Sequence, residues 1–173
     1  MGDRSAAAVG SSLFFLLAPG VVAGVIPWWI TRWRTGDPYL WPIRVAGVVI
    51  LVAGTIVLVS AFARFVTEGS GTPAPVAPTQ RLVIGGLYRH VRNPMYVAVL
   101  ATIVGQALVL GRVALVAYGA VVAIAFVVVV HLYEEPTLLR TFGEDYEEYR
   151  RAVPGWWPRL RPWTPGGDES VDA

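Results

Sequence analysis

The chain has 173 residues, of which 55% are hydrophobic and only 15% are charged. A water-soluble domain of this size contains about 25% charged residues, so the composition indicates a membrane protein. Cysteine is absent, which excludes disulfides and thiolate metal sites, and all 14 basic residues are arginine, which excludes a lysine Schiff base. The net charge of +2, carried by scattered arginines, does not support nucleic-acid binding. Lysine-free usage rich in Ala, Val, Gly and Arg fits a GC-rich bacterial genome.

Four uncharged apolar segments are the clearest signal in the sequence. A helix needs roughly 20 such residues to cross a bilayer, and the second and fourth segments meet that length. The third is slightly short, but Pro94 can extend it as a first-turn residue. We therefore predict an all-α integral membrane protein with about four transmembrane helices. The segments are residues 13–30, 45–63, 95–111 and 113–132.

The first segment is interrupted by Pro19 and Pro27. Because Arg4 precedes a short apolar stretch, a removable signal peptide is an alternative to a membrane helix. No convincing small-x-small cleavage site precedes Trp28-Trp29, and this aromatic pair is better explained as an anchor at the membrane interface. We therefore expect a retained helix.

The short link Leu110-Gly111-Arg112 joins the third and fourth segments, which predicts an antiparallel helical hairpin. With four crossings, both termini and residues 64–93 share one side of the membrane, which carries ten arginines against four on the other. The positive-inside rule then places the termini and this loop in the cytoplasm. The prediction is a multi-pass protein of the cell inner (plasma) membrane.

Polar regions flank the predicted hairpin. Residues 69–86 are rich in Pro and Gly, which predicts little regular structure. From Glu134 onward, apolar residues at helical spacing predict an amphipathic helix that lies on, or is packed under, the cytoplasmic membrane face, with a break at Gly143. The apolar stripe of this helix consists of Leu138, Leu139, Phe142, Tyr146 and Tyr149.

The last part of the chain contains Trp156, Trp157 and Trp163, a pattern typical of interfacial anchoring. Residues 164–173 are predicted to be disordered. The expected organisation is an N-terminal membrane region (1–66), a core of loop, hairpin and amphipathic helix (67–163) and a disordered C-terminal end (164–173).

Two polar clusters are expected to meet at the cytoplasmic edge of the hairpin. One is LYRHVRNPMY (residues 87–96), which enters the third helix, and the other is HLYEE (131–135), which leaves the fourth. The two arms of the hairpin span roughly 27 and 36 Å of helix, so both clusters reach the same edge. We predict that the basic residues of the first cluster face the acidic pair Glu134-Glu135.

Each cluster also has an ordinary explanation. Arg89, His90 and Arg92 are typical positive flank residues, and the acidic pair can be a solvated helix extension. Carboxylates close to hydrocarbon are nevertheless costly unless they are paired or bound to a ligand, and convergence of the clusters favours a binding site. His131 is either a ligand or general base, or a helix-end histidine bonded to a backbone carbonyl.

The groups in these clusters indicate the ligand that such a site would hold. Carboxylates suit an amino group or ribose hydroxyls, and arginines with exposed loop amides suit a carboxylate. Aromatic residues such as Tyr88 and Tyr96 can cover a ring or a cation. A zwitterionic, nucleoside-bearing cofactor would use all of these groups.

The motif GLYRHVRNPMY, followed later by YEEPTLLRTFGEDYEEYRRAVP, resembles the C-terminal half of the isoprenylcysteine carboxyl methyltransferase and phospholipid methyltransferase superfamily. The resemblance covers residues 71–158, about half of the chain. It implies a multi-pass membrane enzyme that binds S-adenosylmethionine without a Rossmann fold. The expected partners are the lipid bilayer and a lipophilic or lipid methyl acceptor, with no nucleic acid and no metal.

The resemblance also implies site residues. Methyl transfer is an in-line displacement that depends mostly on positioning and desolvation. The candidates for a catalytic role are Asn93, Tyr96 and His131; where the acceptor needs deprotonation, His131, His90 or a tyrosine is the candidate base. The implied cofactor-binding residues are Gln80, Arg81, Leu82, Val83, Tyr88, Asn93, Pro94, Met95, Tyr96, Glu134 and Glu135.

Two departures from the isoprenylcysteine pattern narrow the expected acceptor. The histidine of the Arg-His-Pro motif is replaced by Asn93, and this variant resembles the phospholipid branch, as does Tyr-Glu-Glu-Pro at residues 133–136. A substrate-binding arginine four residues before the first glutamate is replaced by Val130. Prenylated protein substrates therefore become doubtful, whereas an amine, thiol, hydroxyl or different carboxylate on a lipophilic acceptor stays open.

Two rival functions remain. Sterol-type membrane reductases have a related C-terminal half and use NADPH, but an acidic residue is expected shortly after the motif tyrosine. Here Tyr96 is followed by Val97-Ala98-Val99, which argues against a reductase. The other rival is a non-enzymatic membrane scaffold that has kept the fold without activity.

Overall fold

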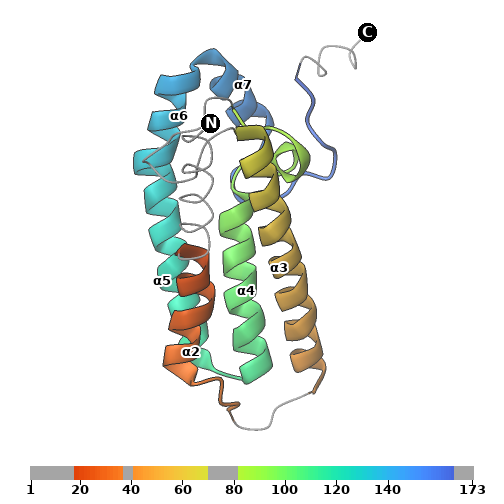
Figure 1. Cartoon of the computed structure of the whole chain (residues 1–173), viewed down its shortest axis with the longest axis vertical. Helices are drawn as coiled ribbons and strands as arrows, with labels where there is room; N and C mark the ends of the chain where they lie inside the picture. Colours follow the sequence, from red (N-terminus) through yellow and green to blue (C-terminus); the bar gives the residue numbers. More distant parts are fainter. Residues whose placement is uncertain (1–17, 37–40, 70–81, 166–173) are drawn as a thin grey trace, which may run out of the picture.

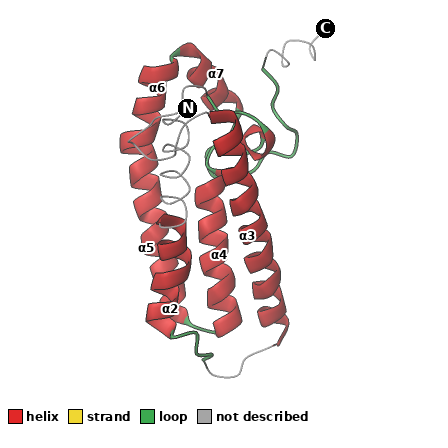
Figure 2. Cartoon of the chain, viewed as in Figure 1, coloured by secondary structure: helices red, strands yellow, loops and turns green. Residues whose placement is uncertain are grey.

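The computed structural model describes residues 18–36, 41–69 and 82–165, except for the side chains of residues 65–69. Every regular element in this part of the chain is a helix (Figure 2), which confirms the predicted all-α class there. Three predicted features lie outside the described residues. They are the site residues Gln80 and Arg81, most of the Pro- and Gly-rich loop, and residues 166–173.

Long helices run side by side in an elongated bundle; at one end α6 continues the line of α5, and α7 folds back over the bundle (Figure 1). A π-helical turn, Val21–Val25, leads into α2 (Ile26–Thr31). The next long helix is α3 (Trp41–Gly69), and a short 3₁₀ helix, Gly86–Arg89, precedes α4 (Pro94–Leu110). The chain then forms α5 (Val113–Val129), a second π-helical turn (Val130–Glu134), α6 (Glu135–Phe142) and α7 (Glu144–Ala152).

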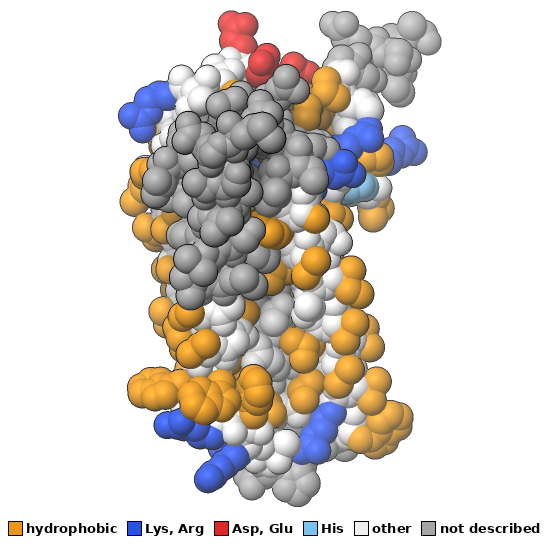
Figure 3. All heavy atoms as spheres, in the orientation of Figure 1, with side chains coloured by type: hydrophobic (Ala, Val, Ile, Leu, Met, Phe, Trp, Pro, Cys, Tyr) orange, Lys and Arg blue, Asp and Glu red, His pale blue; other side chains and the backbone are white. Residues whose placement is uncertain are grey.

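Two helices are long and apolar enough to cross a membrane, namely Trp41–Arg64 and Val113–Phe142. They correspond to the second and fourth predicted segments. The other two, Ala18–Thr31 and Pro94–Leu110, are shorter apolar helices, so four crossings remain a prediction. On the face shown in Figure 3, the described side chains are mostly apolar along the middle of the bundle and charged near its ends, as expected for a bilayer-embedded protein.

The predicted hairpin is present, because only Gly111 and Arg112 separate α4 from α5. Pro94 occupies the first turn of α4, as expected. The predicted boundary at the other end of α5 is wrong. Instead of ending near residue 132, the helix continues through the π-helical turn into α6 and stops at Phe142, and the break predicted at Gly143 separates α6 from α7.

Close packing of α3 against α4 depends on glycines. A Cβ atom placed on Gly105 would lie 2.7 Å from the backbone nitrogen of Leu51, and one on Gly47 would lie 2.8 Å from that of Val109. Gly54 faces the Ala98 carbonyl in the same way, at 3.1 Å. The spacing of Gly47 and Gly54, which suggests a small-residue contact in the sequence, therefore serves packing within the chain.

Polar side chains inside the bundle bind the first π-helical turn. Such a turn leaves carbonyls without their usual i+4 partners. The Gln106 amide donates to the Ala23 carbonyl at 2.6 Å, and the Tyr118 hydroxyl donates to the Val22 carbonyl at 2.8 Å. These bonds tie α4 and α5 to the N-terminal helix and satisfy carbonyls that would be costly to bury without a partner.

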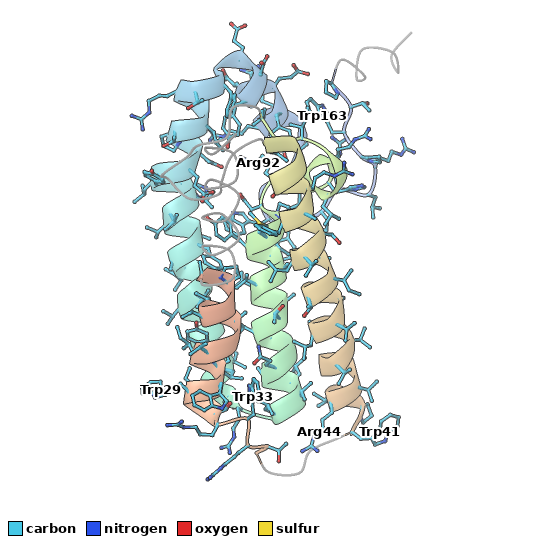
Figure 4. The ribbon with its side chains drawn as sticks, viewed as in Figure 1. Trp29, Trp33, Trp41, Arg44, Arg92 and Trp163 are labelled. Atoms are coloured by element: carbon cyan, nitrogen blue, oxygen red, sulfur yellow. The ribbon has the colours of Figure 1, made fainter. Side chains whose placement is uncertain are left out.

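The end of the bundle opposite the short helices carries exposed tryptophans and arginines. Figure 4 shows Trp29, Trp33, Trp41 and Arg44 there, far from Arg92 and Trp163. Trp29, Trp33 and Trp41 are 66%, 61% and 73% exposed. Aromatic rings with cationic neighbours are typical of the membrane–water interface, in agreement with the anchoring predicted for the Trp28-Trp29 pair.

Candidate functional site

Arg92 joins the hairpin to the C-terminal residues at the other end of the bundle (Figure 4). Its Nη1 atom donates to Glu135 Oε1 at 2.8 Å and to the Tyr146 hydroxyl at 3.2 Å, while its Nε atom donates to the Val153 carbonyl at 2.9 Å. The other carboxylate oxygen of Glu135 lies 3.6 Å from Arg150. Because the Glu135 side chain is only 8% exposed, these two guanidinium groups offset the cost of burying its charge.

The adjacent carboxylate, Glu134, has a different environment. It accepts a hydrogen bond from the Tyr96 hydroxyl. The Tyr96 ring also contacts two other aromatic rings, with centroid distances of 4.5 Å to Phe126 and 6.4 Å to Trp156. Glu134 and Tyr96, with these two rings, form the candidate site. A carboxylate beside aromatic faces is an arrangement that suits a cation.

Local structure explains why two adjacent glutamates have different partners. Successive residues of a helix point about 100° apart, so one can face the tail while the other faces α4. Here the pair follows a π-helical turn, a feature that is frequent at functional sites. Pro136 falls in the first turn of α6, where its missing N–H costs little.

The segment before α4 is bound to the C-terminal tail, residues 153–163, by eight hydrogen bonds among the described residues. Four join backbone atoms and four use a side chain of residues 89–93. Arg89 and Trp163 exchange two bonds, with Arg89 Nε 2.6 Å from the Trp163 carbonyl, and His90 Nδ1 donates to the Arg159 carbonyl at 2.8 Å. The prediction that all basic residues of this segment face the acidic pair is therefore correct for Arg92 and wrong for Arg89 and His90.

Asn93 takes part in the same attachment. Its side-chain amide donates to the Gly155 carbonyl at 3.1 Å, and its backbone N–H donates to the same oxygen at 3.3 Å. A Cβ atom on Gly155 would lie 3.2 Å from Arg92 Nη2, so this close approach favours glycine. Asn93, which replaces the histidine of the isoprenylcysteine Arg-His-Pro motif, thus fixes the tail next to Tyr96.

A small, mainly aromatic cluster joins α7 to the tail. Tyr146, Tyr149, Val153 and Trp163 are all buried, and the Tyr149 hydroxyl donates to the Tyr88 carbonyl at 2.7 Å. Burial raises the pKa of Tyr149 above its ordinary value, against the opposing effect of the Arg92 guanidinium. Burial likewise raises the pKa of Tyr146. Both phenols are therefore neutral hydrogen-bonding groups at physiological pH.

This cluster corrects two expectations. Trp163 is only 6% exposed and packs on Tyr149 with ring centroids 5.5 Å apart, so it is not an interfacial anchor. Trp157, in contrast, is 81% exposed. The predicted apolar stripe is also incomplete. Leu138 and Phe142 pack against the cluster, but Leu139 is 39% exposed and does not join it.

The remaining predicted cofactor residues that the structure describes are packed against other apolar side chains. Val83 and Tyr88 are buried with Ala61, and Met95 packs against them. Leu82 packs instead against the aromatic cluster under the tail. Pro94 is buried at the start of α4. Contacts with other side chains account for the burial of these residues.

His131 is exposed on the π-helical turn. Its Nδ1 atom lies 3.0 Å from the Val127 carbonyl. Because a carbonyl only accepts, Nδ1 carries the proton, and in the neutral ring the Nε2 lone pair is left available. The geometry thus matches one of the two alternatives for His131, a helix-end histidine bonded to a backbone carbonyl. It also leaves Nε2 available as a basic nitrogen.

Sequence reasoning did not find Phe126 and Trp156. Phe126 reads as one apolar residue among many in α5, and Trp156 reads as one of three tail tryptophans. The signal available for Phe126 was its helical spacing. It lies about two turns before Glu134, on the same side of the helix. Nothing local marks Trp156, since its position depends on backbone bonds to residues 92 and 93.

The fold and the site together define a helical membrane protein with a polar, aromatic-lined site at one end of its bundle. The family model for phospholipid methyltransferases matches residues 43–145, more than half of the chain. The chain therefore belongs to the phospholipid methyltransferase family, a family of membrane methyltransferases. A comparison with curated proteins gave no match.

Proposed function

We propose that this protein is an S-adenosylmethionine-dependent methyltransferase that acts on a small lipophilic acceptor at the cytoplasmic face of the bacterial inner membrane. The observation that carries the proposal is the Glu134 carboxylate, which accepts a hydrogen bond from Tyr96, a residue whose ring pairs with those of Phe126 and Trp156. Membership in a methyltransferase family supports the reaction type.

The chemistry of these residues fits a cationic, zwitterionic cofactor. S-adenosylmethionine supplies an activated methyl group on a sulfonium when it is bound. In the proposal, Glu134 receives the ammonium group of its methionine part, and Tyr96 borders the sulfonium with its ring. Glu135 acts through Arg92, since both its oxygens already face guanidinium groups. Gln80, Arg81, Leu82, Val83, Tyr88, Asn93, Pro94 and Met95 complete the proposed cofactor-binding set.

The proposed catalytic work is mainly positioning. Tyr96 is fixed by its bond to Glu134, and Asn93 fixes the tail beside it, so both hold the reacting groups in line. In the proposal, the Phe126 and Trp156 rings beside Tyr96 also help to exclude water from the reacting groups. Where the acceptor has to lose a proton, His131 is the candidate base, with its Nε2 atom as the receiving site.

The acceptor is proposed to reach the site from the bilayer. Apolar side chains of α5 such as Val121 and Ile124 are 65% and 66% exposed, and Phe126 links that helix to Tyr96. Val130, at the position of a substrate-binding arginine in the isoprenylcysteine enzymes, is 1% exposed. A prenylcysteine carboxylate would find no cation there, which favours a phospholipid or another lipophilic amine, thiol or alcohol.

The test is calorimetric binding of S-adenosylhomocysteine to the detergent-purified protein, with NADPH as the parallel ligand. We expect saturable binding of S-adenosylhomocysteine alone, weakened by about tenfold or more in Glu134→Gln, since a hydrogen bond to a charged group is worth roughly 1.5–3 kcal/mol. Glu148→Gln, an exposed acid on α7, is the matched control and should bind like the wild type. Binding of NADPH instead would replace the methyltransferase with a reductase, and a folded protein that binds neither would support a scaffold.

A further inference from the structure

The C-terminal tail is part of the site rather than an appendage. It lies beyond residues 43–145, the part of the chain that matches the family. Arg92 N–H donates to the Pro154 carbonyl at 2.9 Å, and Asn93 donates twice to that of Gly155. These bonds immediately precede Trp156 in the chain. The backbone of the tail is therefore fixed at the point where its indole approaches Tyr96.

Trp156 and its neighbour Trp157 differ sharply. The Trp156 ring is partly buried and lies 6.4 Å from the Tyr96 ring, centroid to centroid, with a tilt of 38°. Trp157 is 81% exposed and belongs to no aromatic pair among the described residues. Anchoring in a membrane interface accounts for an exposed tryptophan but gives no reason for this contact with Tyr96.

The origins of the two rings beside Tyr96 suggest a division of the site. Phe126 comes from the apolar part of α5, eight residues before Glu134 and so about 12 Å deeper along the helix. Trp156 comes from the C-terminal tail, which lies at the end of the bundle that carries α7 (Figure 1). A lipophilic molecule would meet Phe126, and a water-soluble cofactor would meet Trp156.

We infer that Trp156 is a cofactor-binding residue whose indole face, with the Tyr96 ring and the Glu134 carboxylate, encloses the positively charged end of S-adenosylmethionine. This inference rests on the proposed function. Indole is the best cation partner among the aromatic side chains. Hydrogen bonds from residues 92 and 93 hold the indole in place before the ligand arrives, which reduces the entropic cost of binding.

The experiment compares a cationic and a neutral ligand on the full-length protein in detergent. Sinefungin carries an amine in place of the sulfonium, whereas S-adenosylhomocysteine is an uncharged thioether at that position. Trp156→Leu should weaken sinefungin binding about tenfold and S-adenosylhomocysteine binding much less. Trp156→Phe should fall between leucine and the wild type for sinefungin, and Trp157→Leu should match the wild type for both ligands.

Each outcome decides between the possibilities. Equal affinities in Trp156→Leu and the wild type would overturn the inference and leave the proposed function standing. Equal losses for both ligands, together with a lower thermal midpoint, would show that Trp156 has only a structural role. If Trp156→Leu does not fold, Trp156→Phe decides: sinefungin should bind about threefold more weakly with S-adenosylhomocysteine unchanged, and wild-type affinity would refute the inference. A folded wild type that binds neither ligand overturns the proposed function and the inference together.

Discussion

Replacing Arg92 with methionine is expected to destabilise the protein strongly, because it leaves the Glu135 carboxylate buried with one cation instead of two. The Arg92 side chain is 14% exposed and that of Glu135 is 8% exposed. Removing one member of such a pair costs about 3–5 kcal/mol. Arg150 stays 3.6 Å from the second oxygen but is 47% exposed, so it offsets only part of the loss. We expect a net loss of about 2–4 kcal/mol, or roughly 4–16 °C in thermal midpoint.

The measurement is thermal unfolding in detergent micelles, followed by circular dichroism. The Arg151–Glu147 pair on α7 supplies a matched control, since its atoms lie 2.6 Å apart but its side chains are 75% and 50% exposed. Arg151→Ala should cost at most about 1 kcal/mol. The double variant Arg92→Met/Glu135→Leu should recover most of the stability, because no buried charge remains. If Arg92→Met loses no more stability than Arg151→Ala, the assignment of Arg92 as the compensating charge is refuted.

Three further predictions address the helices and the aromatic cluster. Gly105→Ala should cost about 1–3 kcal/mol in the same unfolding assay, because its Cβ would meet the Leu51 backbone at 2.7 Å. The control Gly24→Ala, whose Cβ would have no atom within 4 Å, should leave the stability unchanged. Equal effects of the two substitutions would disprove the close contact. Gln106→Leu and Tyr118→Phe should each cost about 0.5–2 kcal/mol by freeing a carbonyl of the first π-helical turn, and wild-type midpoints in both would contradict that role. Because burial raises the pKa of Tyr149 while an unfolded tyrosine ionises near pH 10, the contribution of Tyr149 to stability should be constant below about pH 10 and fall above it. A pH titration of the thermal midpoint should show a smaller alkaline decline in Tyr149→Phe than in the wild type, and identical slopes would rule out this contribution.

The sequence was sufficient to predict the hairpin and one half of the site. A three-residue link fixes the two helices as neighbours, and helix rise alone brings Tyr96 and Arg92 to the level of Glu134 and Glu135. Side-chain type then limits the partners, because buried carboxylates need cations or hydroxyl donors. This prediction succeeded because both partners in each contact are side chains, and the sequence specifies every side chain.

The tail could not be predicted in this way, because its partners are backbone carbonyls. Every residue has a carbonyl, so no letter of the sequence shows that Arg89, His90 and Asn93 bind those of Trp163, Arg159 and Gly155. The π-helical turns could not be predicted from the sequence either, for a related reason. VVVVHLY is uniformly favourable for an apolar helix, and one extra residue in a helical turn leaves no mark on composition.

The two glutamates show how one short motif serves both stability and ligand binding. Glu135 is surrounded by charges that the protein supplies, and it connects α6 to the tail through Arg92. Glu134, one residue earlier, receives only a neutral hydroxyl from Tyr96 among the partners in the described residues. A carboxylate in this position gains more from an incoming cation than one already paired. The architecture fixed by Glu135 therefore allows Glu134 to be stabilised by a cationic ligand, which is the role that the proposed cofactor requires.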